Sequence, residues 1–467
     1  MSNTDRFLGP KVTEGESNTS DLRKQWNSRA LGDVSRSLID RDARTFLHQS
    51  LSTPCMAAIR KAEGIWIEDV EGRRYMDFHG NSVHHIGYGH PRLVQAVTDQ
   101  IHDLPFAPRR YTCEPAIELA EMLASRAAVL QQSPSDWKVL LTTGGSDAIE
   151  TALKIARAKT GRFKTISFWD AFHGAGLGSA SVGGEAMFRS HIAGPLLPGT
   201  EHVAPFSCYR CVYGYPAPHG QPDLDVCKMT CAQMIRYVLE KEGDVAAVVA
   251  EPSRAVPYVA PPGFWQAVRQ ACDAAGALLI FDEIPTGLGK TGRFFAAEHE
   301  GVTPDIFVLG KALGGGMLPI AAVLARDELN VTGDFAIGHY THEKNPVTTR
   351  AALTTLEIIR DEGLAERADE LGKHATERLR AMQDRHTAIG DIRGRGLLIG
   401  VELVLDRQEK APANDLTESV FYHCLEAGLS FKITNGNTLT LSPPLTISQA
   451  DLEHALDIVD AALTECR

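Results

Sequence analysis

Lys311 stands between an apolar segment, residues 306–310, and a run of three glycines, residues 314–316. A lysine at a strand end is most often an exposed surface residue, and that is the ordinary interpretation. The alternative is chemical, because burial lowers the pKa of an amine and lets it attack a carbonyl to form a Schiff base. Glycines beside it would let a bulky ring approach the backbone. Lys311 is therefore the first candidate for covalent chemistry.

Asp282 is the second candidate, because it ends another apolar segment, residues 277–281. An aspartate in this place can simply cap the next turn. A buried carboxylate that faces a pyridinium nitrogen, however, keeps that nitrogen protonated and makes the ring an electron sink. Asp282 and Lys311 lie 29 residues apart, about the length of one β-α-β unit. We therefore expect both side chains to reach one crevice at the edge of a sheet.

Two further segments follow predicted strands and suit a ring that carries a phosphate. Residues 142–148, Thr-Thr-Gly-Gly-Ser-Asp-Ala, lie between a strand and a helix. Backbone N–H groups and the helix dipole favour an anion there, although Ser146 could serve only as an N-cap. Phe172 and His173 follow the predicted strand 164–169. An aromatic ring in that place can lie over a cofactor or simply pack in the core.

Short apolar segments alternate with helical ones between about residues 115 and 320. This alternation predicts an α/β domain with a mostly parallel sheet. The predicted strands are residues 138–143, 164–169, 245–251, 277–283 and 305–310. Ligands gather at the carboxyl ends of such strands, which is where the candidate residues lie.

The flanking regions predict smaller pieces. Residues 1 to about 44 are interpreted as a poorly packed arm, and the C-terminal region as a small α+β domain with a hairpin around residues 396–403 and 438–442. Residues 64–79 predict a β-hairpin, and Pro91 begins a helix through Gln100. We expect three regions: an N-terminal arm with part of the small domain (1–79), a large cofactor-binding domain (80–340) and a C-terminal small domain (341–467).

The composition is that of an ordinary soluble globular chain of 467 residues. Its formal net charge of -12 argues against nucleic acid or an anionic membrane as the main partner. No apolar run reaches the roughly 18 residues of a membrane span, and the polar N-terminus lacks a secretory signal. Nine cysteines, an odd number, fit a reducing compartment, so we expect a cytoplasmic protein.

In this order, the four candidate segments resemble the class III pyridoxal-phosphate-dependent aminotransferases over about residues 60–460. The resemblance also includes GYGHP (87–91), DEIPTGLGKTG (282–292), PDIFVLGKALGGG (304–316), RGRG (393–396) and PPL (443–445). It implies an α/β protein of fold type I, with a large, mostly parallel sheet and a small α+β domain. It also implies pyridoxal 5'-phosphate as cofactor and a homodimer with active sites at the subunit interface.

The resemblance gives each candidate a role. Lys311 would hold the cofactor and act as the catalytic base, and Asp282 would pair with the pyridine nitrogen. The other cofactor contacts would be Gly145 and Ser146 at the phosphate, Phe172 stacked on the ring, His173 near the ring oxygen, and Thr341 at the phosphate of the neighbouring subunit.

Two positions depart from the family pattern and bear on the substrate. Pro285 replaces a glutamine that touches the ring hydroxyl, and Thr440 replaces an arginine that clamps an α-carboxylate. A hydroxyl is a poor substitute for a planar carboxylate clamp, so we expect an amine whose reacting carbon bears no carboxylate. Other groups could bind a different anion. The substrate candidates are Arg110, Arg254 and Asn81, each equally open to interpretation as a surface or loop residue.

Within the family, four segments most resemble the (R)-1-hydroxy-2-aminoethylphosphonate ammonia-lyases. They are HGNSVHHIGYGHP (79–91), APRRYTCEPAIELAE (107–121), EPSRAVPY (251–258) and YTHEKNP (340–346). This implies a lyase that eliminates the β-hydroxyl of a small aminophosphonate and releases phosphonoacetaldehyde and ammonia. Two alternatives stay open: an ω-amine:keto-acid transaminase, and a non-catalytic protein that binds the cofactor. The intact pair of Lys311 and Asp282 speaks against the second.

Four cysteines form a C-x2-C pair and a C-x3-C pair, at positions 208, 211, 227 and 231. This spacing suits a structural zinc site, two disulfides, or four thiols in a loop. Metal spacing alone over-predicts zinc, so Cys208, Cys211, Cys227 and Cys231 are only a candidate structural site. We expect no catalytic metal.

Overall fold

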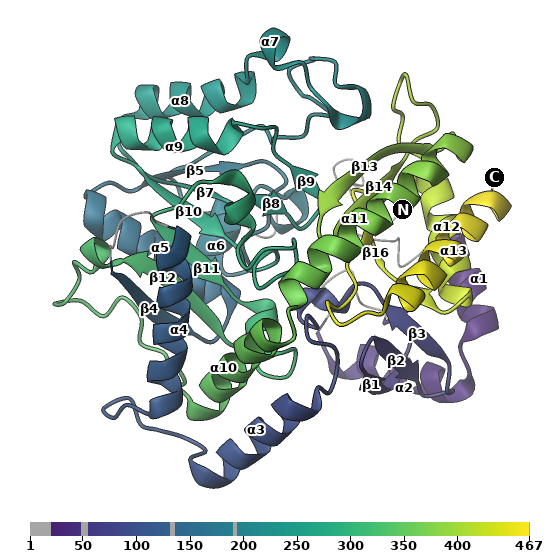
Figure 1. The fold of residues 1–467 in the computed structure, drawn as a ribbon, viewed down its shortest axis with the longest axis horizontal. Coiled ribbons are helices and arrows are strands. Elements are labelled where there is room, and N and C mark those ends of the chain that lie inside the picture. The colour runs from purple at the N-terminus through teal and green to yellow at the C-terminus, as the bar shows by residue number, and fades with distance from the viewer. Residues whose placement is uncertain (1–19, 48–54, 131–135, 190–193, 467) are drawn as a thin grey trace. The chain divides into compact units, whose positions relative to one another are not determined.

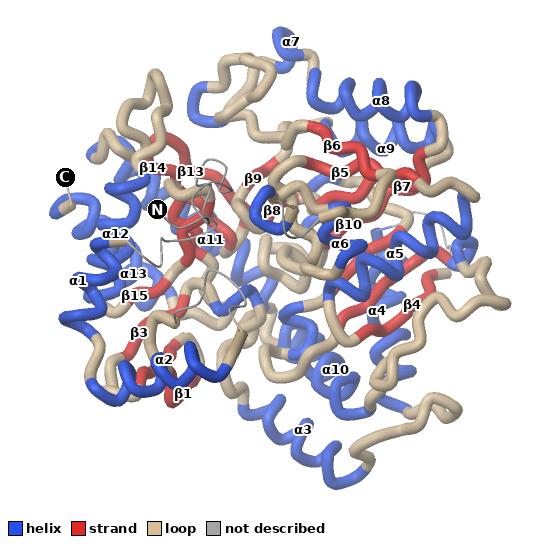
Figure 2. Tube along the Cα trace, turned by 180° about the vertical axis from the view of Figure 1, so that it is seen from behind, coloured by secondary structure: helices blue, strands red, loops and turns tan. Residues whose placement is uncertain are grey.

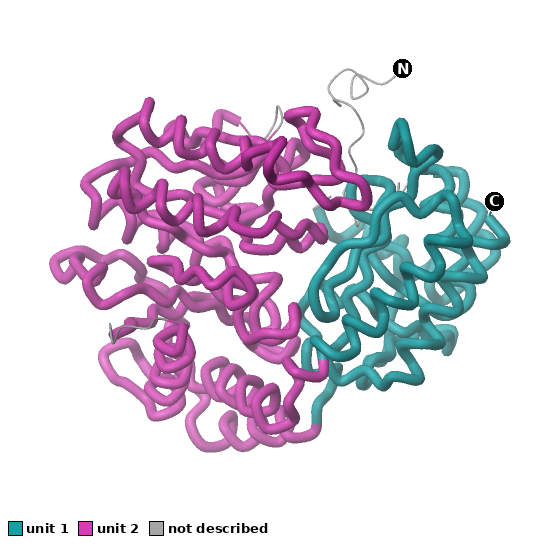
Figure 3. The backbone as a smooth tube through the Cα atoms, turned by 45° about the horizontal axis from the view of Figure 1, so that its top comes forward, with its two compact units in different colours: residues 1–90, 368–467 teal, residues 91–367 magenta. Residues whose placement is uncertain are grey.

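The computed structural model describes residues 20–47, 55–130, 136–189 and 194–466. The chain forms two compact units (Figure 3), a large unit of residues 91–367 and a small unit made of residues 1–90 and 368–467. Every segment predicted as a strand of the cofactor-binding domain lies in the large unit. Among the described residues, no helix combines the length and the apolarity needed to cross a membrane.

The large unit is built on a sheet of seven strands. In spatial order they are β4 (Trp137–Thr142), β12 (Ala321–Arg326), β11 (Ile306–Leu309), β10 (Leu278–Asp282), β7 (Val245–Ala250), β5 (Lys164–Phe168) and β6 (Thr200–Val203). Strand β12 runs antiparallel to both of its neighbours, whereas the pairings among β11, β10, β7, β5 and β6 are parallel. This confirms the mostly parallel sheet and all five predicted strands. Strands β6 and β12 were not predicted.

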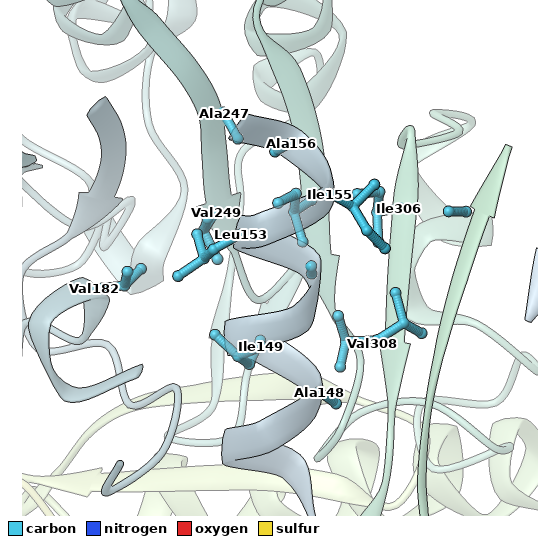
Figure 4. Packing of buried hydrophobic residues seen from close by; sticks show 14 of the residues in the cluster. Ala148, Ile149, Leu153, Ile155, Ala156, Val182, Ala247, Val249, Ile306 and Val308 are labelled. Atoms are coloured by element: carbon cyan, nitrogen blue, oxygen red, sulfur yellow. The ribbon is translucent and has the colours of Figure 1, made fainter. Parts of the chain in front are cut away.

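Helices cover both faces of this sheet. Helix α5 (Gly145–Thr160) carries apolar side chains at Ala148, Ile149, Ala152, Leu153 and Ala156, a helical spacing that places them on one face (Figure 4). They pack against side chains of β7, β10, β11 and β12, and burial of a large aliphatic side chain contributes about 1.5–3 kcal/mol. This packing fixes the start of α5 beside the strand ends.

The other helices of the large unit complete the two layers. Helix α9 (Phe264–Ala275) packs aromatic side chains against the opposite side of the sheet, with Trp265 4.9 Å from the ring of Phe281. Helices α8 (Thr230–Glu242) and α9 lie side by side (Figures 1 and 2). The remaining helices are α3 (Pro91–Asp103), α4 (Glu114–Leu130), α6 (Leu177–Val182), α7 (Leu224–Cys227) and α10 (Pro346–Asp361).

The small unit contains two four-stranded sheets. One is β1 (Ile59–Glu63), β2 (Trp66–Asp69), β3 (Arg74–Asp77) and β15 (Leu429–Ser430), which confirms the predicted hairpin. The other is β13 (Ile389–Arg395), β14 (Leu398–Leu403), β17 (Thr438–Leu441) and β16 (Lys432–Thr434). Helices α11 (Leu364–Arg385), α12 (Asn414–Glu426) and α13 (Gln449–Glu465) accompany them.

The prediction of a poorly packed arm at residues 1–44 is wrong for residues 20–44, the part that the structure describes. Residues 21–45 form helices α1 (Asp21–Ala30) and α2 (Asp33–Thr45), and Ser20 caps the first of them. Trp26 is buried with its ring 6.1 Å from that of Tyr422, so α1 is held by α12 rather than loosely placed. Residues 1–19 lie outside the described residues.

The predicted domain boundary at residue 340 also lies too early. The large unit extends to Arg367, because helix α10 packs against α3 and α4 of that unit. Its N-terminus is set by Asn345, whose Oδ1 accepts hydrogen bonds from the backbone N–H groups of Val347 and Thr348. At the other end, the large unit begins at Pro91 rather than at residue 80.

Candidate active site

Lys311 is held in a strained turn directly after strand β11. Its φ of 47° lies in the left-handed region, where a residue other than glycine costs about 1–3 kcal/mol and often marks a functional site. The side chain is partly exposed, as a reacting amine must be. Burial lowers the pKa of Lys311, and the negative charges of Glu251 and Asp282 oppose that shift without cancelling it. The turn therefore presents an amine that loses its proton more readily than a surface lysine.

Asp282 and His173 form a buried pair beside this turn. The Oδ2 atom of Asp282 lies 2.7 Å from Nδ1 of His173, and Oδ1 accepts a hydrogen bond of 3.0 Å from the backbone N–H of Ile284. The carboxylate of Asp282 accepts a hydrogen bond from Nδ1–H of His173, so Nε2 is the ring nitrogen that is not bound to Asp282. That Nε2 atom is buried and has no hydrogen-bond partner among the described residues. A group from outside the described chain would satisfy it.

The N-terminus of helix α5 lies beside the same strand ends and is shaped to receive an anion. The N-cap residue, Gly144, provides no side-chain hydrogen bond to the first turn, so its amides are available to a ligand. A Cβ atom on Gly145 would come within 2.9 Å of Ile284, and one on Gly174 would collide with Ser146. Ser146 accepts a hydrogen bond of 3.1 Å from the backbone N–H of Ala175. Because Gly145 and Gly174 have no Cβ atom, Ile284 and Ser146 can pack closely around the first turn of α5.

Phe172 does not pack in the core. Its side chain is 38% exposed, and its ring contacts that of Phe188 at a centroid distance of 4.6 Å. The structure therefore excludes simple core packing, which the sequence left open. An exposed ring next to His173 remains available to stack on a flat ligand.

Glu283, the second acid after strand β10, has a structural task. Its carboxylate accepts hydrogen bonds from the hydroxyl of Thr286 and from the backbone N–H groups of Ala296 and Ala297, at 3.0, 2.9 and 2.8 Å. Burial nevertheless raises the pKa of Glu283 to about 7. Pro285 follows in a buried turn. Glu283 therefore holds the turn after Asp282 in place rather than facing a ligand.

Arg254 is buried in the short strand β8 (Ser253–Arg254), which pairs with β9 (Tyr258–Val259). Its Nη2 donates a hydrogen bond to the backbone oxygen of Asp170, and its Nε lies 3.8 Å from Oε1 of Glu251. The Nε and Nη1 atoms have no hydrogen-bond partner among the described residues. A buried guanidinium with unused donors is costly unless an anion completes it.

Two glutamates near Arg254 were missed as site residues. Burial raises the pKa of Glu251, and the charge of Glu251 acts in turn on Lys311. Burial also raises the pKa of Glu185 to about 7, against the opposing influence of Arg254. The Glu251-Pro252 pair was a visible signal in the sequence, whereas Glu185 stands in no recognisable motif.

The roles of three predicted residues stay predictions. Thr341 is exposed in the turn before α10, and Arg110 is exposed between α3 and α4. Within the large unit, no described contact joins either of them to Lys311 or Asp282. Asn81 belongs to the small unit, where its φ is 47°. Thr440, also in the small unit, is buried with its hydroxyl 2.9 Å from that of Thr434.

Comparison with known proteins identifies the relatives of this chain. The family model for aminotransferase class-III matches residues 48–463. An (R)-1-hydroxy-2-aminoethylphosphonate ammonia-lyase from Vibrio splendidus is 43% identical over 97% of this chain and 95% of its own. A leucine/methionine racemase from Thermococcus litoralis is 36% identical over 92% and 95%, respectively. An amine transaminase from an uncultivated Pseudomonas species, solved with pyridoxal phosphate bound, superposes with a TM-score of 0.82 at 29% identity, covering 91% and 99%.

The residues of the site fit the cofactor that these relatives indicate, pyridoxal 5'-phosphate. Lys311 supplies an amine of lowered pKa, and the first turn of α5 supplies amides for a phosphate. Phe172 offers a ring face, and the buried Asp282 carboxylate, oriented by His173, offers a partner for a protonated ring nitrogen. Each requirement of the cofactor is met by a residue of the large unit.

Proposed function

This chain belongs to the class III aminotransferase family, and we propose that within it the chain acts as an ammonia-lyase on (R)-1-hydroxy-2-aminoethylphosphonate. The observation that carries the proposal is the 43% identity to such a lyase over 97% of the chain. The products would be phosphonoacetaldehyde and ammonia, as part of phosphonate degradation. The family itself does not decide the reaction, because its members include racemases and transaminases.

The chemistry needs one proton to be removed and one hydroxide to leave. When bound, pyridoxal phosphate activates the substrate amine and draws the electron pair of the neighbouring C–H bond into its ring. The amine of Lys311 takes that proton, since its pKa is lowered by burial. The C–O bond on the next carbon then breaks, and the leaving hydroxide takes the proton held by Lys311 and departs as water. Hydrolysis of the released enamine uses one water and yields the aldehyde and ammonia, so no second organic substrate is consumed.

Asp282 and His173 serve as the fixed electrostatic support for this step. Asp282 would pair with the ring nitrogen of the bound cofactor, and its hydrogen bonds from His173 and Ile284 hold the carboxylate in one orientation. A preoriented carboxylate needs no rearrangement when charge develops on the ring.

Arg254 is the proposed site for the phosphonate. Its Nη1 group, which has no hydrogen-bond partner among the described residues, can donate to an oxygen of an anion. The Oε1 atom of Glu251 lies 3.8 Å from Nε of Arg254, and the charge of Glu251 also raises the pKa of Lys311. Arg110 and Asn81 remain weaker candidates for the same task.

We also propose a homodimer in which Thr341 reaches the phosphate of the partner's cofactor. The exposure of Thr341 supports this, because its hydroxyl is accessible to another chain.

The deciding experiment is to incubate the purified holoenzyme with the hydroxyphosphonate and no keto acid. We expect release of ammonia and phosphonoacetaldehyde over many turnovers per active site. Strict dependence on pyruvate or 2-oxoglutarate would instead support the second candidate, an ω-amine transaminase, which the structural likeness to an amine transaminase favours. A matched sample of the Lys311→Ala variant controls for contaminating activity.

A further inference from the structure

The four cysteines that the spacing set apart line one small cavity of the large unit. The cavity has a volume of about 30 Å³, room for one or two water-sized spheres. Its wall also contains the aromatic side chains of Phe206, Tyr213 and Tyr215. Most of its lining residues belong to the loop between strand β6 and helix α8. That loop includes the short helix α7 (Figure 2). The cysteines lining it are Cys208, Cys211, Cys227 and Cys231.

The backbone between the second pair of cysteines is held in an unfavourable conformation. Helix α7 ends at Cys227, and the next two residues, Lys228 and Met229, have φ angles of 47° and 51°. Each left-handed residue other than glycine costs about 1–2 kcal/mol. Thr230, which begins α8, donates a hydrogen bond of 2.7 Å to the backbone oxygen of Cys227. This tight turn returns the chain so that Cys231 lines the same cavity as Cys227.

We propose that this cavity is a structural metal site in which one zinc ion is bound by the thiolates of Cys208, Cys211, Cys227 and Cys231. Zinc prefers four soft ligands in a closed tetrahedral site, and it has no redox chemistry of its own. Among the described residues, no group of three His, Cys, Asp or Glu side chains is already arranged as a metal site, so thiol side chains would turn on binding. Each bound thiolate gives up its proton to solvent, so four protons are released per ion.

Such a site would stabilise the segment between β6 and α8 and would take no part in catalysis. The loop contains few regular elements, and metal binding supplies folding free energy that offsets the strain at Lys228 and Met229. The proposal stands on the cysteines alone and is independent of the reaction at Lys311.

The test is metal analysis of the purified holoenzyme. Inductively coupled plasma mass spectrometry should find one zinc per chain in the wild type, and none in the double variant Cys227→Ser/Cys231→Ser. The variant Cys466→Ser, a half-buried cysteine near the C-terminus, is the matched control and should keep its zinc. Wild-type protein stripped under reducing conditions and loaded with Co²⁺ should show the ligand-field bands of tetrahedral thiolate coordination.

Three results would overturn the proposal. One is the absence of stoichiometric zinc and of the cobalt bands in reduced wild-type protein. A second is iron with acid-labile sulfide in place of zinc. The third is a thiol titration that finds the four cysteines joined in two disulfides. If the double variant does not fold, the zinc content and cobalt spectrum of the wild type still decide.

Discussion

The end of strand β10 and the β8–β9 turn both bury charged groups in the large unit, yet they satisfy them differently. Both oxygens of Asp282 have donors within the chain. Arg254 has the backbone oxygen of Asp170, but its Nε and Nη1 atoms find no hydrogen-bond partner among the described residues. In the first region the carboxylate has its hydrogen-bond donors before a ligand arrives, as suits support for a resident cofactor. The second keeps donors in reserve, as suits a substrate that comes and goes.

The largest effect is expected from changing the completed region. In Asp282→Asn, the amide keeps the shape of the carboxylate but loses the charge, and its nitrogen would donate toward Nδ1 of His173. We expect kcat for ammonia release to fall on the order of 10²–10³-fold, because a fixed charge at the ring nitrogen is lost. Cofactor content, measured by absorbance, should stay near one per chain.

His173→Asn is the matched control for this change, because it removes the orienting partner and leaves the charge. Its expected loss is smaller, about 10–100-fold. If Asp282→Asn loses less activity than His173→Asn, Asp282 is not the partner of the ring nitrogen.

The second largest effect is expected from changing Arg254, whose guanidinium has donors without a partner among the described residues. Truncating one side of a buried charged pair costs about 2–5 kcal/mol, so Arg254→Gln should raise KM for the hydroxyphosphonate at least about 30-fold. Arg254→Lys should recover only part of this, because a lysine lacks the planar fork. The measurement compares kcat/KM for the phosphonate with that for a hydroxylated amine without an anion.

If Arg254→Gln no longer prefers the phosphonate over the amine without an anion, as measured by the ratio of the two kcat/KM values, Arg254 is the anion site. Arg110→Gln, at an exposed arginine of the same unit, is the control and should leave the ratio unchanged. Discrimination that survives in Arg254→Gln and disappears in Arg110→Gln would move the anion site to Arg110.

The smallest effect is on stability and comes from Glu185. Its pKa of about 7 in the folded protein lies above the ordinary value of 4.5, so between these values the folded chain keeps a proton that the unfolded chain has lost. Stability therefore falls as pH rises through this range. In Glu185→Gln, Tm of the holoenzyme should fall less between about pH 5 and about pH 8.

Part of that pH dependence should remain in the variant, because burial gives Glu283 a similarly raised pKa. Glu240→Gln, at an exposed position of helix α8, is the matched control. An unchanged slope in Glu185→Gln would show that Glu185 does not retain its proton in the folded protein.

The cofactor side of the site could be predicted from the sequence because its signals are local. Lys311 and Asp282 each follow an apolar strand of a parallel sheet, and such strands end at one edge. Gly144, Gly145 and Ser146, at the start of α5, are likewise consecutive in the chain. Local pattern was therefore sufficient to gather the residues that the structure places together.

The parts that could not be predicted depend on contacts between distant residues. Strand β12 was missed because its neighbours, β4 and β11, come from far apart in the chain. Helix α1 is held by Tyr422, almost 400 residues later, so the N-terminal sequence gave no sign of its packing. The burial of Glu185 and Glu251 has the same origin, because burial of a charge is a property of the whole fold.

The small unit draws on both ends of the chain, and this affects the order in which the protein can fold during synthesis. Strand β3 pairs in parallel with β15, so Met76 and Asp77 find their partners at Leu429 and Ser430. At ribosomal speeds of about 5–20 residues per second, roughly 20–70 seconds separate their synthesis. The large unit is continuous in sequence and can fold within that interval. The hairpin edge at β3 stays exposed meanwhile, and is a natural place for a chaperone to protect the nascent chain.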